Sequence, residues 1–482
     1  MRKRFEPQIL LGQLPIEETR IPLKSRDPLV ALVAALKKLY ITPEWNEKIF
    51  AILEQKIVSG KKKTGRYGMN LWQIFVLAQF RLAINCSYDR LHLMSNNDKM
   101  LRQLMGVETE SGFEDYEFEY QNILDNVGLL DDQTVRELND VIVSFGHEVF
   151  KKKDTEALAL KTDSFVVESN VHFPTDYNLL WDCFRKCLDT MDIVLEKYPE
   201  TEGWRKINNW RIELKRMMRN IGFANRSGGK DKEKRVLKSA SQYVEKAKLL
   251  STKISKSIKD FPIQENSDLV QILELEKFKI LLDKHIDLVE RRLIKHEVIP
   301  HEEKMFSIFE QFTEWITKGK LRPNVELGKR LAITTDQYHL IVDYKVMENE
   351  TDSEIVLPLA IRILDKFKVY SWSFDKGFWN KFIKALLKDE VLKLVMPKKG
   401  KCNQQERQEE TDKIFVRLRN KHSAIESNIN ELEFSGLDRC PDKGYEHFKR
   451  YIGLAVCAYN LKRIGRRLIE IARAEQEFKQ AA

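Results

Sequence analysis

One strand-forming segment of this chain is separated from the others by a long stretch of helical patterns. The segment ALALKTDSFVV, which begins at about residue 156, is β-rich and largely apolar, as in a strand covered on both faces. Residues 178–300 then carry long helical patterns, and strand patterns return at 330–346, 369–374 and 391–396. This order predicts an α/β sheet domain, interrupted by a large helical insertion.

The length of 482 residues also predicts more than one domain, because single cores stop growing at about 250–300 residues. We expect an N-terminal helical, DNA-binding domain over 1–150. The sheet domain should comprise 151–177 and 301–441, on either side of the insertion at 178–300. Residues 442–482 should form a long amphipathic helix with a basic face, packed onto the sheet domain.

The N-terminal part contains three consecutive helical patterns joined by tight turns. Apolar spacing predicts a helix at 71–84, Ser87 is suited to cap a second, and Gly106 is suited to end a third. Such a trio is typical of a helix-turn-helix module, although an ordinary small helical bundle has the same pattern. If the module binds DNA, the candidates for reading bases lie on the third helix: Lys99, Arg102 and Gln103.

Charge favours a polyanionic partner. Lysine and arginine number 82 against 73 aspartates and glutamates, a formal net charge of +9. The insertion contains a glycine-containing basic loop, NRSGGKDKEKR, after a helix with basic residues on one side. This pattern is typical either of a solvated turn or of an arm that contacts DNA phosphates. The candidates for such contacts are Arg216, Arg219, Lys230 and Arg235.

Three acids lie where a nuclease metal site would need them. Asp163 lies within the first predicted strand, and Asp375 directly follows the strand at 369–374. An unpaired carboxylate is costly to bury, so Asp163 must be paired, exposed or bound to a cation. Glu426 is predicted on a helix, at the edge of an apolar stripe, where it points either into a cleft or into solvent. Two such aspartates and a glutamate can hold two divalent metal ions that act on phosphodiesters.

Other chemistries lack their motifs. The phosphate-binding pattern G-x-x-x-x-G-K-[ST] is absent, and His296 and His301 do not have the spacing of a zincin helix. His447 and Arg450 match the H-x-x-R of tyrosine recombinases, but Tyr459 follows too closely to be the usual nucleophile. The six cysteines include no C-x-x-C pair, and no signal peptide or long apolar run is present. We therefore expect reduced thiols, no membrane association and a cytoplasmic location.

Several collinear segments resemble bacterial insertion-sequence transposases of the DDE type. The first is MNLWQIFVLAQFRLAINCSYDRLHLMSNNDKMLRQLMG, and the second runs from FSIFEQFTEWITKGK to EIVLPL. SFDKGF and KHSAIESNINELEFSGLDRCPDKGYEHFKRYIGLAVCAYNLKRIG follow. The resemblance spans roughly residues 66–467. Some relatives have the helix pattern Tyr-x-x-Arg-x-x-x-Glu-x-x-x-x-x-x-Lys. Only its glutamate is present here, as Glu426, because the other three positions hold Arg419, His422 and Glu433.

The resemblance implies an RNase H-like catalytic domain with an Asp163, Asp375 and Glu426 triad that binds two Mg²⁺ or Mn²⁺ ions. His422 would orient Glu426, touch a phosphate or make a structural hydrogen bond. The implied partners are double-stranded DNA, both element ends and target, and further copies of the chain, at least a dimer, associated with the nucleoid. The sequence leaves open a DNA-binding protein without catalysis and a metal-dependent nuclease that cuts without joining. The candidate contacts between copies are 178–300 and 442–479.

Overall fold

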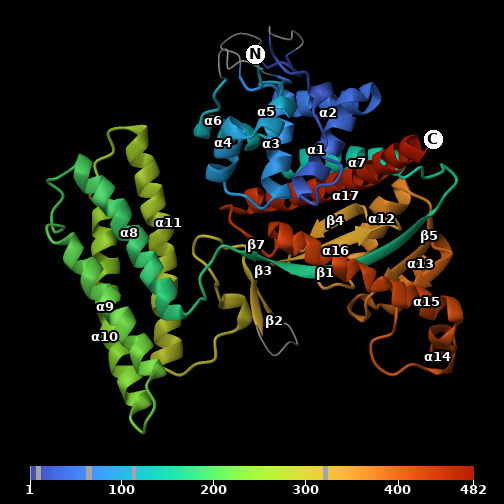
Figure 1. The fold of residues 1–482 in the computed structure, drawn as a ribbon. Coiled ribbons are helices and arrows are strands. Elements are labelled where there is room, and N and C mark those ends of the chain that lie inside the picture. Colours follow the sequence, from blue (N-terminus) through green and yellow to red (C-terminus); the bar gives the residue numbers. More distant parts are fainter. Residues whose placement is uncertain (1, 7–11, 61–67, 111–115, 318–323, 482) are drawn as a thin grey trace. The chain divides into compact units, whose positions relative to one another are not determined.

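The expected sheet forms, and it belongs to one of the two units into which the chain divides (Figure 1). The computed structural model describes residues 2–6, 12–60, 68–110, 116–317 and 324–481. The first unit joins Met1–Asn170 to Ile316–Ala482, and the second is Val171–Trp315. The six cysteines are present as thiols and form no disulfide with one another. In the described ranges, no helix is both long and apolar enough to cross a membrane.

The sheet combines antiparallel and parallel pairing. β3 lies antiparallel to both β1 and β4, whereas β5 lies parallel to β1, and β6 parallel to β5. This mixed sheet with helices on it confirms the predicted fold class and is consistent with an RNase H-like fold. The strands are β1 (Leu158–Ser169), β2 (Glu314–Thr317), β3 (Val325–Thr335), β4 (Ile341–Val346), β5 (Val369–Phe374), β6 (Lys393–Val395) and β7 (Arg439–Cys440).

Helices cover both faces of the sheet. On one face, Trp372 and Phe374 of β5 pack with Leu160 of β1 in an apolar core that includes residues of α12 and α13. On the other face, α15 contacts β5 and β6, and α16 contacts β1. The alternation of side chains along β1 and β5 therefore separates an apolar face from a polar one. These helices are α12 (Val356–Lys366), α13 (Lys381–Glu390), α14 (Gln404–Thr411), α15 (Lys413–His422) and α16 (Ala424–Leu432).

The N-terminal helices gather around the long C-terminal helix α17 (Tyr445–Ala481), which packs against α1, α3 and α7 (Figure 1). Gly465 permits the approach of α17 to α1, because a Cβ there would lie 1.7 Å from the carbonyl oxygen of Ala31. The other helices of this group are α1 (Pro28–Ile41), α2 (Pro43–Ile57), α3 (Leu71–Ala83), α4 (Tyr88–Asn97), α5 (Lys99–Leu104), α6 (Tyr120–Val127) and α7 (Asp132–Val149).

The middle of α17 is more deeply buried than its sequence predicts. Every residue from 451 to 462 is buried, including Lys462, which is 2% exposed. Lys462 donates hydrogen bonds to Ser435 Oγ and to the carbonyl oxygen of Ala83, and burial lowers its pKa to about 8. The predicted basic face is therefore wrong at this level of the helix. The apolar stripe proposed as a contact between copies is covered by the chain's own helices.

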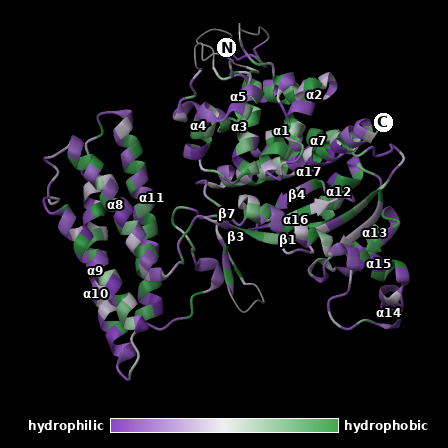
Figure 2. Ribbon diagram, in the orientation of Figure 1, coloured by the Kyte–Doolittle hydropathy of each residue, from purple (hydrophilic) through white to green (hydrophobic). Residues whose placement is uncertain are grey.

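The second unit is a four-helix bundle. Figure 2 shows hydrophilic and hydrophobic residues alternating along these helices, as amphipathic helices require. Their apolar sides form one core around Phe184, Tyr243 and Leu282. The predicted helices are confirmed as α8 (Asp176–Lys197), α9 (Ile207–Arg226), α10 (Lys232–Lys259) and α11 (Asn266–Val289).

Candidate active site

Asp163 lies in the middle of β1, on the sheet face that α15 and α16 cover. Its side chain is half-buried, and one carboxylate oxygen accepts a hydrogen bond from the backbone N–H of Ser164 at 2.8 Å. Among the residues that the structure describes, no lysine, arginine or histidine forms an ion pair with Asp163. The strand thus holds a partly desolvated carboxylate without a counter-charge.

Asp375 and Glu426 are positioned around Asp163 by the fold. In the parallel pair of β1 and β5, Thr162 is opposite Phe374, so Asp375 leaves its strand at the level of Asp163. Glu426 lies in the first turn of α16, which packs against β1. Both side chains are exposed. Three segments that are distant in sequence therefore bring their acids to one edge of the sheet.

The electrostatics of Asp163 reflect this gathering of acids. Burial raises the pKa of its carboxyl to about 6, and the negative charges of Asp375, Asp352 and Glu426 contribute in the same direction. Like charges raise a carboxyl pKa in this way when they are close to it. A bound cation would relieve both the desolvation and the repulsion.

Asp352 is a fourth acid at this site that sequence reasoning missed. Its Oδ1 accepts a 2.7 Å hydrogen bond from Ser164 Oγ and lies 3.7 Å from Arg330. A Cβ added to Gly377, two residues after Asp375, would lie 3.0 Å from Asp352 Oδ2. The local sequence NETDSE has the composition of a solvated acidic loop, so it contains no signal that distinguishes Asp352 from its neighbours.

His422 is a polar residue on α15 beside the acids. Its Nδ1 lies 3.0 Å from Ser373 Oγ, and its Nε2 is buried without a hydrogen-bond partner among the described residues. Burial lowers the pKa of the imidazole, while the charge of Asp375 raises it. Of the three roles considered for His422, this contact with Ser373 matches the structural hydrogen bond.

The donor set suits a hard divalent cation. Asp163, Asp352, Asp375 and Glu426 all offer carboxylate oxygens, which Mg²⁺ and Mn²⁺ prefer. The unpaired, partly buried Asp163 fits the same requirement. In the described ranges, no three acids, histidines or cysteines are close enough together to ligate one ion. The identity of the ligands therefore stays a prediction.

The residues predicted to read bases differ in exposure. Lys99 is exposed at the start of α5, whereas Gln103 donates a 3.0 Å hydrogen bond to the carbonyl oxygen of Pro15. Arg102 is only 6% exposed and forms a 2.9 Å ion pair with Glu108. Its other donors bond the carbonyl oxygens of Ser95, Val107 and Tyr116. We correct the prediction for Arg102, because this guanidinium is engaged inside the protein and fastens α5 to the loop that follows.

The phosphate-contact residues predicted in the insertion are all exposed. Arg216 and Arg219 lie on α9, and Lys230 lies in the loop that follows it. Arg235 donates a 2.8 Å hydrogen bond to the carbonyl oxygen of Gly228. None of the four forms an ion pair with a described residue, so their charges are available to a partner. Binding to DNA at these positions stays a prediction.

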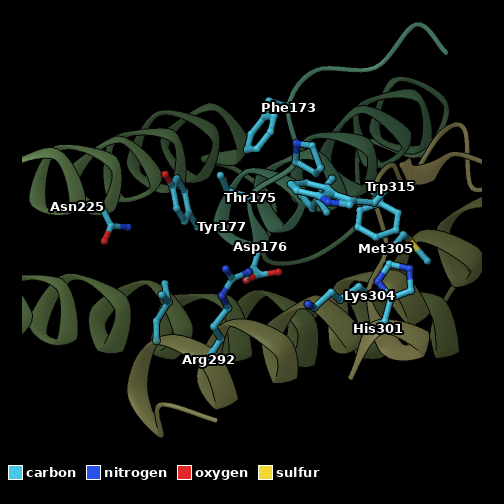
Figure 3. Close-up of a pocket in the computed structure, with 14 residues that line it drawn as sticks. Phe173, Thr175, Asp176, Tyr177, Asn225, Arg292, His301, Lys304, Met305 and Trp315 are labelled. Atoms are coloured by element: carbon cyan, nitrogen blue, oxygen red, sulfur yellow. Dashed lines mark hydrogen bonds and ion pairs between the residues drawn. The ribbon is translucent and has the colours of Figure 1, made fainter. Parts of the chain in front are cut away.

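A cavity in the second unit has a different character (Figure 3). It has a volume of about 430 Å³ and an aromatic wall, in which the ring of Trp315 lies 5.5 Å from Phe173 and 5.6 Å from Phe306. Its lining includes one carboxylate, Asp176, which is paired with Arg292 at 2.7 Å. This cavity therefore lacks the acids that metal-dependent phosphodiester chemistry requires.

Comparison with known proteins identifies the domain that carries the acids. Residues 295–461 match the family described as "Transposase DDE domain". The matched range contains Asp375 and Glu426, while Asp163 precedes it in the chain. No curated protein and no solved structure matches this sequence. The mixed sheet and this match support a DDE-type transposase, a family that generally uses divalent metal ions and has DNA as its partner.

Proposed function

We propose that this chain binds the terminal repeats of its own insertion sequence, cleaves the DNA there and joins the freed 3′ ends to target DNA. The observation that carries the proposal is the charge environment of Asp163. This half-buried carboxylate forms no ion pair with a described residue, and the negative charges of three further acids act on it. Residues 295–461 of the same chain match a transposase DDE domain.

Cleavage and joining are the same displacement at phosphorus. An oxygen of water, or of the freed 3′-hydroxyl, bonds to phosphorus while the bond to a 3′-oxygen breaks. The nucleophile loses its proton, and the departing 3′-oxygen gains one. Two bound Mg²⁺ or Mn²⁺ ions would supply activation of the attacking oxygen and stabilisation of the leaving one.

The chain's own residues would hold this arrangement in place. Asp163, Asp375 and Glu426 are the residues that would hold the ions. Asp352 fixes Ser164 and so restrains the backbone next to Asp163. Burial favours a neutral His422, whose unpartnered Nε2 can hydrogen-bond to Glu426 or to a phosphate.

A strand-transfer assay separates the three candidate functions. The chain is incubated in Mg²⁺ with pre-cleaved ends, taken from the sequences that flank its coding region, and a supercoiled plasmid. A transposase joins ends to the plasmid, a nuclease only cuts, and a DNA-binding protein without catalysis does neither. Intact acids at all three positions favour catalysis over binding alone. Failure to join ends that the protein binds and cuts would replace the proposal with the nuclease.

We also propose a working form of at least two copies, because joining two ends to one target needs two active sites in fixed geometry. The helical insertion is the remaining candidate contact, and apolar side chains such as Ile212, Phe223 and Ile280 are exposed on it. Mixing Asp163→Asn with a DNA-binding-deficient copy tests catalysis in trans. Restored cleavage supports the proposal, and full activity of a strictly monomeric protein contradicts it.

A further inference from the structure

A cavity with a volume of about 550 Å³ opens on the polar face of the sheet. Its walls come from β1, β5, α15, α16 and the turn between β3 and β4. This is also the face that carries Asp163, since Lys161 lines the cavity and side chains two apart on a strand share a face. The cavity therefore adjoins the acidic site.

Three cationic side chains line the cavity. They are Lys161 of β1 and Arg417 and Lys421 of α15, and none of these side chains forms an ion pair or hydrogen bond with a described residue. The charge of Asp336 acts on Lys161, but the carboxylate of Asp336 is fully buried and bonded to His147 at 2.8 Å. Cations grouped around a cavity attract an anion.

Serine side chains line the same walls. Ser371 and Ser427 are among the lining residues, and a serine hydroxyl can donate a hydrogen bond to an anion. The hydroxyls of Ser373 and Ser423 already donate to the carbonyl oxygens of Leu160 and Asn420.

The cavity and the acids are linked through His422. Its imidazole lies beside Ser373, a cavity residue, and its pKa responds both to Asp375 and to Lys161. A DNA strand whose scissile phosphate lies at the acids thus has a neighbouring position at which negative charge is favoured. The acids themselves repel phosphate unless cations are bound, so a cationic subsite beside them helps to hold the strand.

We propose that Lys161, Arg417 and Lys421 form a subsite for a backbone phosphate of the DNA strand, next to the phosphate that is cut. This subsite proposal rests on the proposed function, and it adds to that function three residues that position the DNA strand. The same chemistry would accept free inorganic phosphate, so the test separates the two sources.

The test measures binding, and therefore does not depend on cleavage. Lys161→Gln, Arg417→Gln and Lys421→Gln are compared with Lys413→Gln, an exposed lysine of α15 that does not line the cavity. Binding of a duplex with the element's end is measured against salt. Each cavity variant should weaken binding and lower the salt slope by about 0.9, while wild type and Lys413→Gln agree. Equal slopes in all variants, with unchanged thermal unfolding, would overturn the proposal.

A second measurement locates the phosphate. One phosphate at a time, near the cut position, is replaced by a neutral methylphosphonate. At one position, the methylphosphonate should reduce the DNA affinity of the wild-type protein about tenfold. The affinity of Lys161→Gln should not fall further when the same phosphate is replaced. Equal losses in both proteins at every position would exclude a phosphate at Lys161. Inorganic phosphate could instead compete with DNA for the wild-type protein but not for Lys161→Gln, while no methylphosphonate position has an effect. That result would assign the subsite to the free anion and overturn the DNA contact.

Discussion

Asp352 accepts a hydrogen bond of 2.7 Å from the hydroxyl of Ser164, the residue that directly follows Asp163. A loop acid thereby holds the strand at the point where the first carboxylate projects, and its charge contributes to the raised pKa of that carboxyl. This relationship makes Asp352 a positioning residue of the proposed site. It also separates Asp352 from the other acids of its loop.

Asp352→Asn should keep the hydrogen bond to Ser164 but remove one negative charge near Asp163. The acid limb of the pH–rate profile for cleavage should then move to lower pH, because the pKa of Asp163 falls. Asp365→Asn, which removes an exposed acid of α12, is the matched control and should leave the profile unchanged. A merely structural Asp352 would change the rate without moving the profile.

The proposed ligands make a stronger prediction. Asp163→Asn, Asp375→Asn and Glu426→Gln should each reduce cleavage and joining about a thousandfold or more, since each removes several kcal/mol of transition-state stabilisation. Binding to DNA ends should persist, because most phosphate contacts lie elsewhere. Glu433→Gln, a change directly after the helix that carries Glu426, is the control. Wild-type cleavage in Mg²⁺ by any one of the three variants would exclude that residue from the site.

The raised pKa of Asp163 also predicts a pH-dependent stability. With a folded pKa of about 6 and an ordinary value of 3.8, the carboxyl is neutral in both states near pH 3. As pH rises through about 6, the folded state must hold a charge that it disfavours, so stability is lost. Without metal at pH 8, Asp163→Asn should therefore be more stable than wild type, by about 1 kcal/mol.

Thermal unfolding across this pH range checks the sign. The difference between wild type and Asp163→Asn should vanish toward pH 3, where neither side chain is charged. Added Mg²⁺ at pH 8 should stabilise wild type more than the variant, because bound metal favours the folded state. A variant less stable than wild type at pH 8 would contradict the account of Asp163 as an uncompensated charge.

The insertion offers an internally matched test of DNA binding. Arg216→Gln or Arg219→Gln should reduce the salt slope of DNA binding by about 0.9 for each phosphate that the arginine neutralises. Arg211 is the control on the same helix, because its guanidinium is already paired with Asp189 at 2.8 Å and Asp192 at 2.6 Å. Arg211→Gln should leave the slope unchanged. If all three variants bind like wild type, the exposed basic residues of α9 are a solvated surface.

Local patterns determined which segments become strands and helices. The alternation in VYSWSF predicts β5, and Trp372 and Phe374 do pack together in a core while Ser371 and Ser373 face a cavity. The helices of the insertion follow from apolar spacing in the same way. These features are readable because each depends mainly on neighbours within a few residues along the chain.

The candidate acids were also within reach of the sequence, whereas their surroundings were not. Asp163 and Asp375 are conspicuous because a carboxylate interrupts or ends an apolar strand. Asp352 lies in a loop of similar acids, and only the position of that loop beside Ser164 distinguishes it. Likewise, Lys161 becomes part of a cationic cavity only because α15 places Lys421 near it.

The burial of basic residues was decided by tertiary structure alone. Arg102 and Lys462 lie on helices whose sequences predict basic surfaces, yet both are buried. The partners of Arg102 lie within residues 95–116, around its own helix. Lys462 bonds Ala83, which is distant in the sequence. A periodic pattern identifies the apolar side of a helix, but not how many neighbours pack around it. Local sequence patterns account for the helices, the strands and the candidate acids. Packing between distant segments decided which charges are buried, paired or left free, because desolvation depends on all the atoms that surround a group.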